Sequence, residues 1–267
     1  MKTLILCGGR GTYDFDRGER IPKGMSLVGG RPVLWHVMKL YSLQGHNDFV
    51  LALGKGSEQI RDYFLKDLNS LRDLEFNVGT QKVRYLDSSP EESWTVKMID
   101  TGDEAQTGSR IARCRKYLEG ERFFATYSDC LCNLNLTKLL ETHGASGKML
   151  TVTGIQPTSR FGSFTTDTSG NVVDYKNEAR MTGIGGWIHG GFMVMEPTIF
   201  DHVNAFAECS LEKEIFTKLA QLGEVGVFPH AGFWQAVDTE RDVNDLNRLF
   251  SNNQRPWLPD ASALVPM

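Results

Sequence analysis

Residues 4–9, Leu-Ile-Leu-Cys-Gly-Gly, are the stretch of the 267-residue chain that decides its fold class. Four apolar residues follow one another and stop abruptly at two glycines. An uninterrupted apolar run is typical of a parallel strand that is buried on both faces, because alternation with polar residues is expected only where one face meets water. We therefore predict that these residues form the first strand of an α/β sheet.

The elements that follow this strand alternate between helix and strand. Pro32 is a suitable first residue for a helix, because its missing N–H has no partner there in any case, and Gly45 ends the apolar pattern. Residues 49–53 form a second apolar run, and residues 57–65 are expected to be helical with Ser57 as the N-cap. This order predicts a parallel sheet with helices on both of its faces.

The same order continues along the rest of the chain. We expect strands at 96–99, 123–127, 149–154 and 225–228, helices at 109–117, 136–142, 211–222 and 238–250, and antiparallel hairpins from 159 to about 189. Residues 8–30 have no periodic pattern and are expected to be a long loop, which in a compact domain is usually functional or disordered. The predicted fold class is a single α/β domain over residues 1–267, with a mostly parallel central sheet, helices on both faces and a small antiparallel β extension.

The composition is that of an ordinary folded protein and excludes several function classes. Of the chain, 40% is hydrophobic and 23% charged, and 29 basic against 33 acidic residues give a net charge of −4. No basic footprint favours a nucleic acid partner, and no apolar run reaches the roughly 18 residues that a membrane span requires. The five cysteines have no framework spacing, so we expect reduced thiols in a cytoplasmic protein with neither a nucleic acid nor a membrane partner.

A glycine-rich turn, Gly8–Thr12, directly follows the predicted first strand. Glycines let backbone N–H groups approach phosphate oxygens, and open α/β sheets bind ligands at this edge. The turn matches neither the GxGxxG fingerprint nor the P-loop, which argues against a dehydrogenase and a P-loop ATPase. The loop also carries four cations, Arg10, Arg17, Arg20 and Lys23. They would suit a triphosphate, and the alternative is a solvated loop, because three acidic residues offset most of their charge.

Two aspartates follow predicted strands that lie far apart in the sequence. Asp129 comes after the run 123–127, and Asp238 comes after the run 233–237. If both residues lie at the carboxyl edge of one sheet, they can share a hard cation such as Mg²⁺, which bridges phosphates in phosphoryl transfer. The alternative for either residue is a turn or a helix cap, particularly for Asp238 before Thr239.

Several further motifs resemble one enzyme family almost from end to end. They are Gly8-Gly9-x-Gly11-Thr12, Pro22-Lys23-x-Met25, Gly29 to Ser42, Asp100-Thr101-Gly102-Asp103, Thr107-Gly108, Arg160-Phe161-Gly162, Gly190-Gly191-Phe192, Gly232-Phe233-Trp234-Gln235, Asp238-Thr239 and Arg241-Asp242. On these residues the chain is similar to the sugar-phosphate nucleotidyltransferases, and within them to the glucose-1-phosphate cytidylyltransferases. The resemblance implies the Rossmann-like nucleotidyltransferase fold and homo-oligomers.

The resemblance also implies a reaction and a set of site residues. A phosphate oxygen of a small phosphorylated acceptor would attack the α-phosphorus of CTP and release pyrophosphate. The implied residues are Leu6, Gly8, Gly9, Gly11 and Thr12 for the nucleotide, Thr107 and Gly108 for its base, Lys23, Arg10 and Asp129 for catalysis, Asp129 and Asp238 for Mg²⁺, and Tyr13, Arg160, His189 and Gly191 for the acceptor. Little acid–base chemistry is needed, since the attacking phosphate is already ionised.

The chain departs from the family pattern mainly on the acceptor side. Tyr13 stands where the family has arginine, Cys130 replaces the glycine after Asp129, and His189 replaces an asparagine. We therefore expect an active enzyme with an acceptor other than glucose 1-phosphate, either another sugar 1-phosphate or a non-sugar phosphate or phosphonate. The alternative is a catalytically impaired homologue that binds nucleotide in a regulatory or scaffold role. A nucleic-acid-modifying transferase is disfavoured by the acidic balance.

Overall fold

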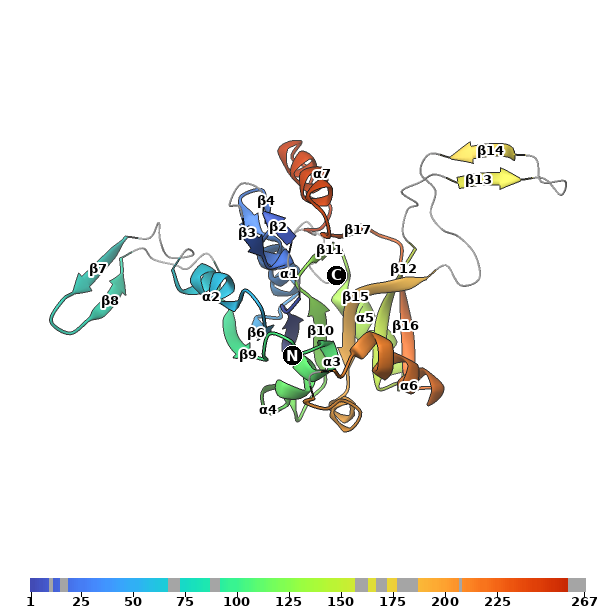
Figure 1. The fold of residues 1–267 in the computed structure, drawn as a ribbon, viewed down its shortest axis with the longest axis horizontal. Helices are drawn as coiled ribbons and strands as arrows, with labels where there is room; N and C mark the ends of the chain where they lie inside the picture. Colours follow the sequence, from blue (N-terminus) through green and yellow to red (C-terminus); the bar gives the residue numbers. More distant parts are fainter. Residues whose placement is uncertain are drawn as a thin grey trace, which may run out of the picture.

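The computed structural model describes residues 1–9, 12–14, 19–66, 73–86, 92–156, 163–166, 172–176, 187–206 and 208–258. Its centre is a seven-stranded sheet with the order β16-β12-β15-β10-β1-β6-β9 (Figure 1). The strands are β1 (Thr3–Leu6), β6 (Asp48–Leu53), β9 (Thr95–Asp100), β10 (Phe123–Tyr127), β12 (Leu150–Ile155), β15 (Ile188–Met195) and β16 (Val225–His230). The stretch that decides the fold class thus lies in the interior of the sheet, as predicted.

All strands of this sheet except β15 point the same way. β1 runs parallel to β6 and β10, β6 runs parallel to β9, and β12 runs parallel to β16. β15 is antiparallel to both of its neighbours, β10 and β12. The mostly parallel sheet is therefore confirmed. The reversed strand lies inside the sheet, whereas the sequence placed antiparallel structure only in an extension.

Helices cover both faces of the sheet. They are α1 (Val33–Ser42), α2 (Ser57–Leu65), α3 (Thr107–Arg113), α4 (Arg115–Leu118), α5 (Leu136–Ser146), α6 (Phe216–Gln221) and α7 (Glu240–Ser251), with short turns η1 (Lys23–Met25), η3 (Pro197–Asp201) and η4 (Leu211–Ile215). None of the helices in the described ranges is long and apolar enough to cross a bilayer.

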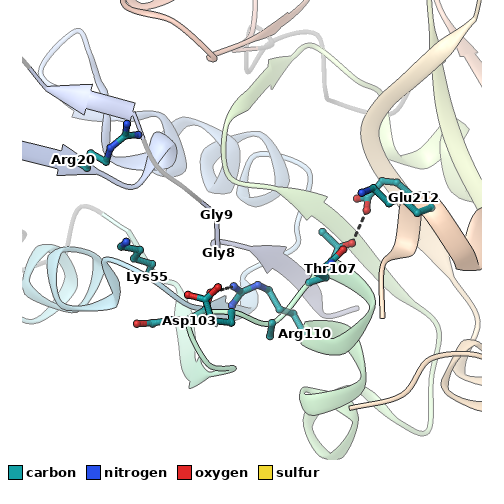
Figure 2. A pocket seen from close by; sticks show the side chains of 12 residues that line it. Gly8, Gly9, Arg20, Lys55, Asp103, Thr107, Arg110 and Glu212 are labelled. Atoms are coloured by element: carbon teal, nitrogen blue, oxygen red, sulfur yellow. Dashed lines mark hydrogen bonds between the residues drawn. The ribbon is translucent and has the colours of Figure 1, made fainter. Parts of the chain in front are cut away.

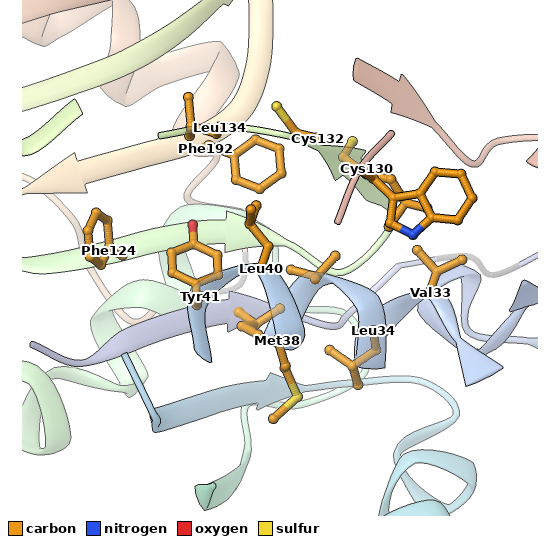
Figure 3. Close-up of a cluster of buried hydrophobic side chains, with 14 of the residues drawn as sticks. Val33, Leu34, Met38, Leu40, Tyr41, Phe124, Cys130, Cys132, Leu134 and Phe192 are labelled. Carbon is orange, nitrogen blue, oxygen red and sulfur yellow. The ribbon is translucent and has the colours of Figure 1, made fainter. Parts of the chain in front are cut away.

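The sheet separates two apolar clusters, as its alternating side chains require. Ile5 belongs to the cluster that contains α1, and Leu4 belongs to the cluster that contains α3 and α6. Figure 3 shows the first cluster, in which Tyr41 of α1 lies edge-on to Phe124 of β10 with ring centroids 5.3 Å apart. Such aromatic pairs add about 0.5–1.5 kcal/mol beyond the burial of their surface. Both faces are thus covered, as the apolar runs predicted.

Five small two-stranded sheets complete the described structure. They are β2 (Thr12–Asp14) with β3 (Glu19–Ile21), β4 (Leu27–Val28) with β5 (Arg31–Pro32), β7 (Leu74–Asn77) with β8 (Lys82–Tyr85), β11 (Cys130–Cys132) with β17 (Trp234–Ala236), and β13 (Ser163–Thr166) with β14 (Val172–Lys176). The β13–β14 pair confirms an antiparallel hairpin in the region where one was expected. The segment 8–30, expected to be a loop, contains the β2–β3 pair, the η1 turn and the strand β4.

Several helix ends differ from those that the sequence predicted. The N-cap of α2 is Gly56, with φ of 77°, and Ser57 is already helical. The helix expected at 109–117 is divided into α3 and α4 at Cys114, and the helix expected at 211–222 begins with the π-helical turn η4. α7 begins at Glu240 because Thr239 and Asp242 form a capping box, so Asp238 lies outside the helix.

Candidate active site

A pocket of about 670 Å³ opens at the carboxyl end of β1 (Figure 2). Gly8 and Gly9, which follow β1, form one wall, and the segment that leads into α3 forms another. The labelled residues around it are Gly8, Gly9, Arg20, Lys55, Asp103, Thr107, Arg110 and Glu212. Ligands of open α/β sheets bind at this edge, so the pocket lies where the sequence predicted a nucleotide.

Arg110 explains why residue 8 is glycine. A Cβ at position 8 would collide with the guanidinium of Arg110. That guanidinium is buried and donates to four oxygens, Leu53 O at 3.0 Å, Thr101 Oγ1 at 2.7 Å, Gly102 O at 3.0 Å and Asp103 O at 3.2 Å. Because these bonds hold it in place, the turn after β1 lies directly against a fixed positive charge.

A second, smaller pocket of about 190 Å³ shares Gly8 and Gly9 with the first. Leu6, Lys23 and Asp129 also line it, together with Tyr127 at the end of β10. The structure thus brings together five of the residues that the sequence assigned to the nucleotide or to catalysis. Two adjoining pockets give room for two ligands that meet at the glycine turn.

Lys23 lies between the two aspartates. Its Nζ donates to Asp238 Oδ1 at 2.5 Å and lies 3.8 Å from Asp129 Oδ2. Burial works against the charged ammonium, but the hydrogen bond to Asp238 and the charge of Asp129 outweigh it and raise the pKa of Lys23. Burial also raises the pKa of Asp129, and the negative charge of Asp238 adds to that effect while Lys23 opposes it.

The two aspartates meet in a way that the sequence did not predict. Asp129 follows β10 of the central sheet, but Asp238 follows β17, which pairs with β11 in a separate sheet. Cys130 faces Ala236 in that pair, and the backbone N–H of Val237 donates to Asp129 O at 2.8 Å. The expectation that both residues end strands of one sheet is therefore wrong for Asp238, although the two carboxylates do lie together.

The donor set at this position fits a magnesium ion. Mg²⁺ is commonly held by one or two carboxylates and completes its octahedron with water and substrate phosphates. Asp129 and Asp238 supply two carboxylates, and a cation already lies between them in the form of the Lys23 ammonium. Within the described ranges no group of three or more His, Cys, Asp or Glu side chains could enclose a metal without substrate.

Thr107, at the start of α3, is held by a carboxylate that the sequence did not single out. Its hydroxyl donates to Glu212 Oε2 at 2.6 Å and accepts from the backbone N–H of Leu211 at 2.9 Å (Figure 2). Gly108 lines neither pocket and packs against Cys209, where a Cβ would lie 2.7 Å from Sγ. Thr107 is thus at the expected pocket, while Gly108 serves the packing behind it.

The reversed strand β15 brings two acceptor-side residues to the same edge. Because it runs antiparallel to β10, its first residues lie beyond the end of β10. Gly191 has φ of 87° and lies beside Tyr127, and the His189 ring lies edge-on to Tyr127 and Phe216. Burial lowers the pKa of His189 to about 4, and its Nε2 has no hydrogen-bond partner among the described residues.

Only some of the remaining predicted site residues lie within the described ranges. Arg10, Gly11 and Arg160 lie outside the described residues. Thr12 and Tyr13 lie on β2, opposite Ile21 and Arg20. Sequence reasoning missed Arg110, Glu212, Tyr127 and Lys55 as pocket residues. Only Arg110 offered a signal, because it is a cation two residues after the matched motif Thr107-Gly108.

Comparison with known proteins identifies the fold. No protein-family model matches the chain. The crystal structure of HddC from Yersinia pseudotuberculosis in complex with GMP-PN superposes with a TM-score of 0.65 at 22% identity, and covers 93% of this chain and 99% of its own. This likeness shows that the chain shares the fold of that protein over nearly its whole length.

Curated relatives identify the family to which the chain belongs. The "Probable glucose-1-phosphate cytidylyltransferase" of Bacillus subtilis (strain 168) is 36% identical over 257 residues, which are 96% of this chain and 99% of the relative. The glucose-1-phosphate cytidylyltransferase of Salmonella typhi is 35% identical over 258 residues, 96% of this chain and 98% of the relative. The chain belongs to the glucose-1-phosphate cytidylyltransferase family and is a nucleotidyltransferase.

Proposed function

We propose that the chain transfers the cytidylyl group of CTP to a sugar 1-phosphate and releases pyrophosphate. The observation that carries this proposal is the cluster of Lys23, Asp129 and Asp238 beside the glycine turn. It combines an ammonium with two carboxylates where two pockets meet. Relatives named for the same reaction, at 35–36% identity over nearly the whole chain, support the choice of CTP and of a sugar phosphate.

The nucleotide occupies the larger pocket in this proposal. Backbone N–H groups of the turn at Gly8 and Gly9 face the triphosphate, and Leu6 lies at the base of the turn. The family resemblance adds Arg10, Gly11 and Thr12 to the residues that bind the nucleotide. Thr107 and the backbone that leads to Gly108 border the base. The four lining cations Arg20, Lys55, Arg110 and Lys213 outnumber the three acidic lining residues Asp103, Glu104 and Glu212, so the described lining is slightly positive in a chain whose net charge is −4.

Orientation and charge neutralisation carry the chemical step. Asp129 and Asp238 would hold Mg²⁺, and that ion would supply neutralisation of phosphate charge. Lys23 remains charged at neutral pH because its carboxylate neighbours raise its pKa, so it stabilises the developing charge on the transferred phosphoryl group. No general base is required, since the attacking phosphate is already ionised.

The acceptor binds in the smaller pocket and along the start of β15. The family resemblance assigns Tyr13, Arg160, His189 and Gly191 to acceptor binding. His189 is neutral at physiological pH, because burial lowers its pKa to about 4. Its Nε2 is buried without a hydrogen-bond partner among the described residues, and a turn of the ring would offer it to an acceptor hydroxyl. The Nε2 of an imidazole lies farther from the backbone than the amide of the family's asparagine, and the ring is bulkier, so the preferred acceptor is a sugar 1-phosphate other than glucose 1-phosphate.

Two further properties belong to the proposal. All five cysteines are free and buried, which supports action in a reducing compartment such as the cytoplasm. We also expect a homo-oligomer, and size-exclusion chromatography with light scattering measures that state directly.

Pyrophosphate release tests the proposed function. Purified protein with Mg²⁺ is given CTP, UTP, dTTP or GTP in turn, each with a panel of sugar 1-phosphates and of non-sugar phosphates and phosphonates. Release with CTP and a sugar 1-phosphate supports the proposal, and the best acceptor names the substrate. CTP binding without release for any pair would favour a regulatory role, and release with a non-sugar acceptor would correct the substrate class.

A further inference from the structure

Glu212 connects the two pockets through hydroxyl groups. Its Oε2 accepts from Thr107 Oγ1 at 2.6 Å and from Ser210 Oγ at 3.1 Å, and its Oε1 accepts from the Tyr127 hydroxyl. Thr107 lines the larger pocket, and Tyr127 lines the smaller one. One carboxylate therefore joins the wall of each pocket, across sequence separations of 105 and 85 residues.

The protonation states fix the direction of these bonds. Burial opposes ionisation of Glu212, but the hydrogen bonds from Thr107 and Tyr127 outweigh it and lower its pKa, so the carboxylate is charged. A carboxylate has no proton to give, so the Tyr127 hydroxyl is the donor of the bond to Oε1. Hydrogen bonds to a charged acceptor are roughly twice as strong as bonds between neutral groups.

The segment that carries Glu212 is itself anchored to the start of α3. Ser210 caps the η4 turn by accepting from the backbone N–H of Lys213, and the N–H of Leu211 donates to Thr107 Oγ1. On the other side, the N–H of Ser109 donates to Cys209 O at 3.0 Å. Thr107 is thus held from two directions, and its hydroxyl both donates and accepts a hydrogen bond within this cluster.

A carboxylate beside a phosphate pocket needs a physical reason, because it repels the anionic ligand. The three hydroxyls that surround Glu212 disperse the charge of its carboxylate. Through them the carboxylate connects the walls of the two pockets. We infer that Glu212 is a positioning residue, which holds the nucleotide wall at Thr107 and the acceptor wall at Tyr127 at a fixed separation. The inference rests on the proposed function, in which these two pockets take CTP and the sugar phosphate.

The test compares Glu212→Ala and Glu212→Gln with the control Glu214→Ala. Glu214 lies in the same turn, is exposed, and makes no side-chain hydrogen bond within the described ranges. For each protein we would measure the Kd of Mg·CTP by calorimetry, the KM for the acceptor, and the midpoint of urea unfolding. Binding is measured without turnover, so it reports on Glu212 even if no acceptor reacts.

We expect Glu212→Ala to weaken CTP binding about tenfold and to raise the acceptor KM, since a hydrogen bond to a charged group contributes about that factor. Glu212→Gln should lie between this variant and the wild type, because its carbonyl oxygen still accepts a hydroxyl. The unfolding midpoint should match that of Glu214→Ala. In a Tyr127→Phe background, Glu212→Ala should raise the acceptor KM much less than it does alone, since the hydrogen bond between residues 127 and 212 is already absent there.

Two results would overturn the inference. One is an unchanged CTP Kd and acceptor KM in Glu212→Ala. The other is an equal loss of CTP affinity in the alanine and glutamine variants, together with a lower unfolding midpoint and an effect on the acceptor KM that is fully additive with Tyr127→Phe. That result would make Glu212 a merely structural residue. Absence of turnover in the wild type with every acceptor would instead contradict the proposed function and leave the CTP Kd to decide the role of Glu212.

Discussion

The ammonium of Lys23 lies 2.5 Å from a carboxylate oxygen of Asp238, a residue 215 positions away in the sequence. The same Nζ lies 3.8 Å from Asp129, so that one cation is shared by two carboxylates. A magnesium ion bound by these carboxylates would compete with the lysine for the same oxygens. Binding of the metal would therefore turn the lysine away from Asp238 and leave its charge available to the nucleotide phosphates.

Replacing Lys23 by methionine should have opposite effects on metal binding and on turnover. Without the competing ammonium, the two carboxylates should bind Mn²⁺, used as a probe for Mg²⁺, more tightly in the absence of nucleotide. Loss of the charge should lower kcat by roughly 10²–10³, as for other groups that stabilise transition-state charge. Electron paramagnetic resonance titration and pyrophosphate release measure the two effects. A lower Mn²⁺ affinity in Lys23→Met would show that the lysine supports the metal instead of competing with it.

Gly8→Ala should disturb the nucleotide pocket through Arg110. The added Cβ collides with the guanidinium, which cannot retreat without breaking its four hydrogen bonds. Overpacking of this kind costs about 1–3 kcal/mol, and the turn should also lose affinity for CTP. Urea unfolding and CTP titration test this against Gly79→Ala, whose Cβ would meet only Asn77 at an ordinary 3.6 Å. Equal stability of the two variants would contradict the explanation.

His36 should make the fold less stable in mild acid. It is buried, with Nε2 donating to Val28 O and Nδ1 accepting from Trp257, and burial lowers its pKa to about 4. Between the usual histidine pKa of about 6.5 and pH 4, the unfolded chain takes up a proton that the fold excludes, so stability falls as the pH falls. This histidine alone accounts for a loss of about 3 kcal/mol.

Urea unfolding at a series of pH values checks this sign and size. His36→Gln cannot titrate, so its free energy of unfolding should decline less steeply than that of the wild type between pH 6.5 and 4. Its stability at pH 7 should be lower, since glutamine replaces the ring packing against Trp257. An unaltered acid slope in this variant would assign the pH dependence to other groups, such as His189, whose pKa is also lowered to about 4.

His189→Asn should shift the acceptor preference toward glucose 1-phosphate. An asparagine offers a carbonyl and an amide to a sugar hydroxyl, and one neutral hydrogen bond changes specificity by about threefold to tenfold. The measurement is kcat/KM for glucose 1-phosphate relative to the best acceptor of the wild type. His202→Asn is the control, because β15 carries the chain to the opposite edge of the sheet before His202. An unchanged ratio would remove His189 from the acceptor site.

The parallel core could be predicted because its signals are local. The apolar run at Leu4–Cys7 and the run 123–127 became β1 and β10, and Pro32 and Gly45 bracket α1. The reversed direction of β15 could not be predicted, because strand direction is set by neighbours far along the chain and not by the residues of the strand. The same holds for β17, which pairs with β11 in a separate sheet and is not a strand of the central sheet.

The position of the candidate site could be predicted from its motifs, whereas single side chains such as Glu212 were missed. The glycine turn, Lys23 and the aspartates stand out by type and by resemblance, and the structure brings them together. Glu212 is one acidic residue in a run of mixed charge, Leu-Glu-Lys-Glu, which is typical of a solvated helix face. Its proposed role depends on hydroxyl groups from β10 and α3, and the sequence pattern does not predict that these groups lie beside it.

The most direct test of the central claim is ³¹P NMR of the wild-type protein with CTP, a sugar 1-phosphate and Mg²⁺, beside Asp238→Asn under the same conditions. The account predicts that CTP and the sugar phosphate disappear together. A CDP-sugar and pyrophosphate should appear in equal amounts, and Asp238→Asn should form them far more slowly. It would be contradicted by CTP that remains intact with every sugar phosphate, or by equal product formation in the variant.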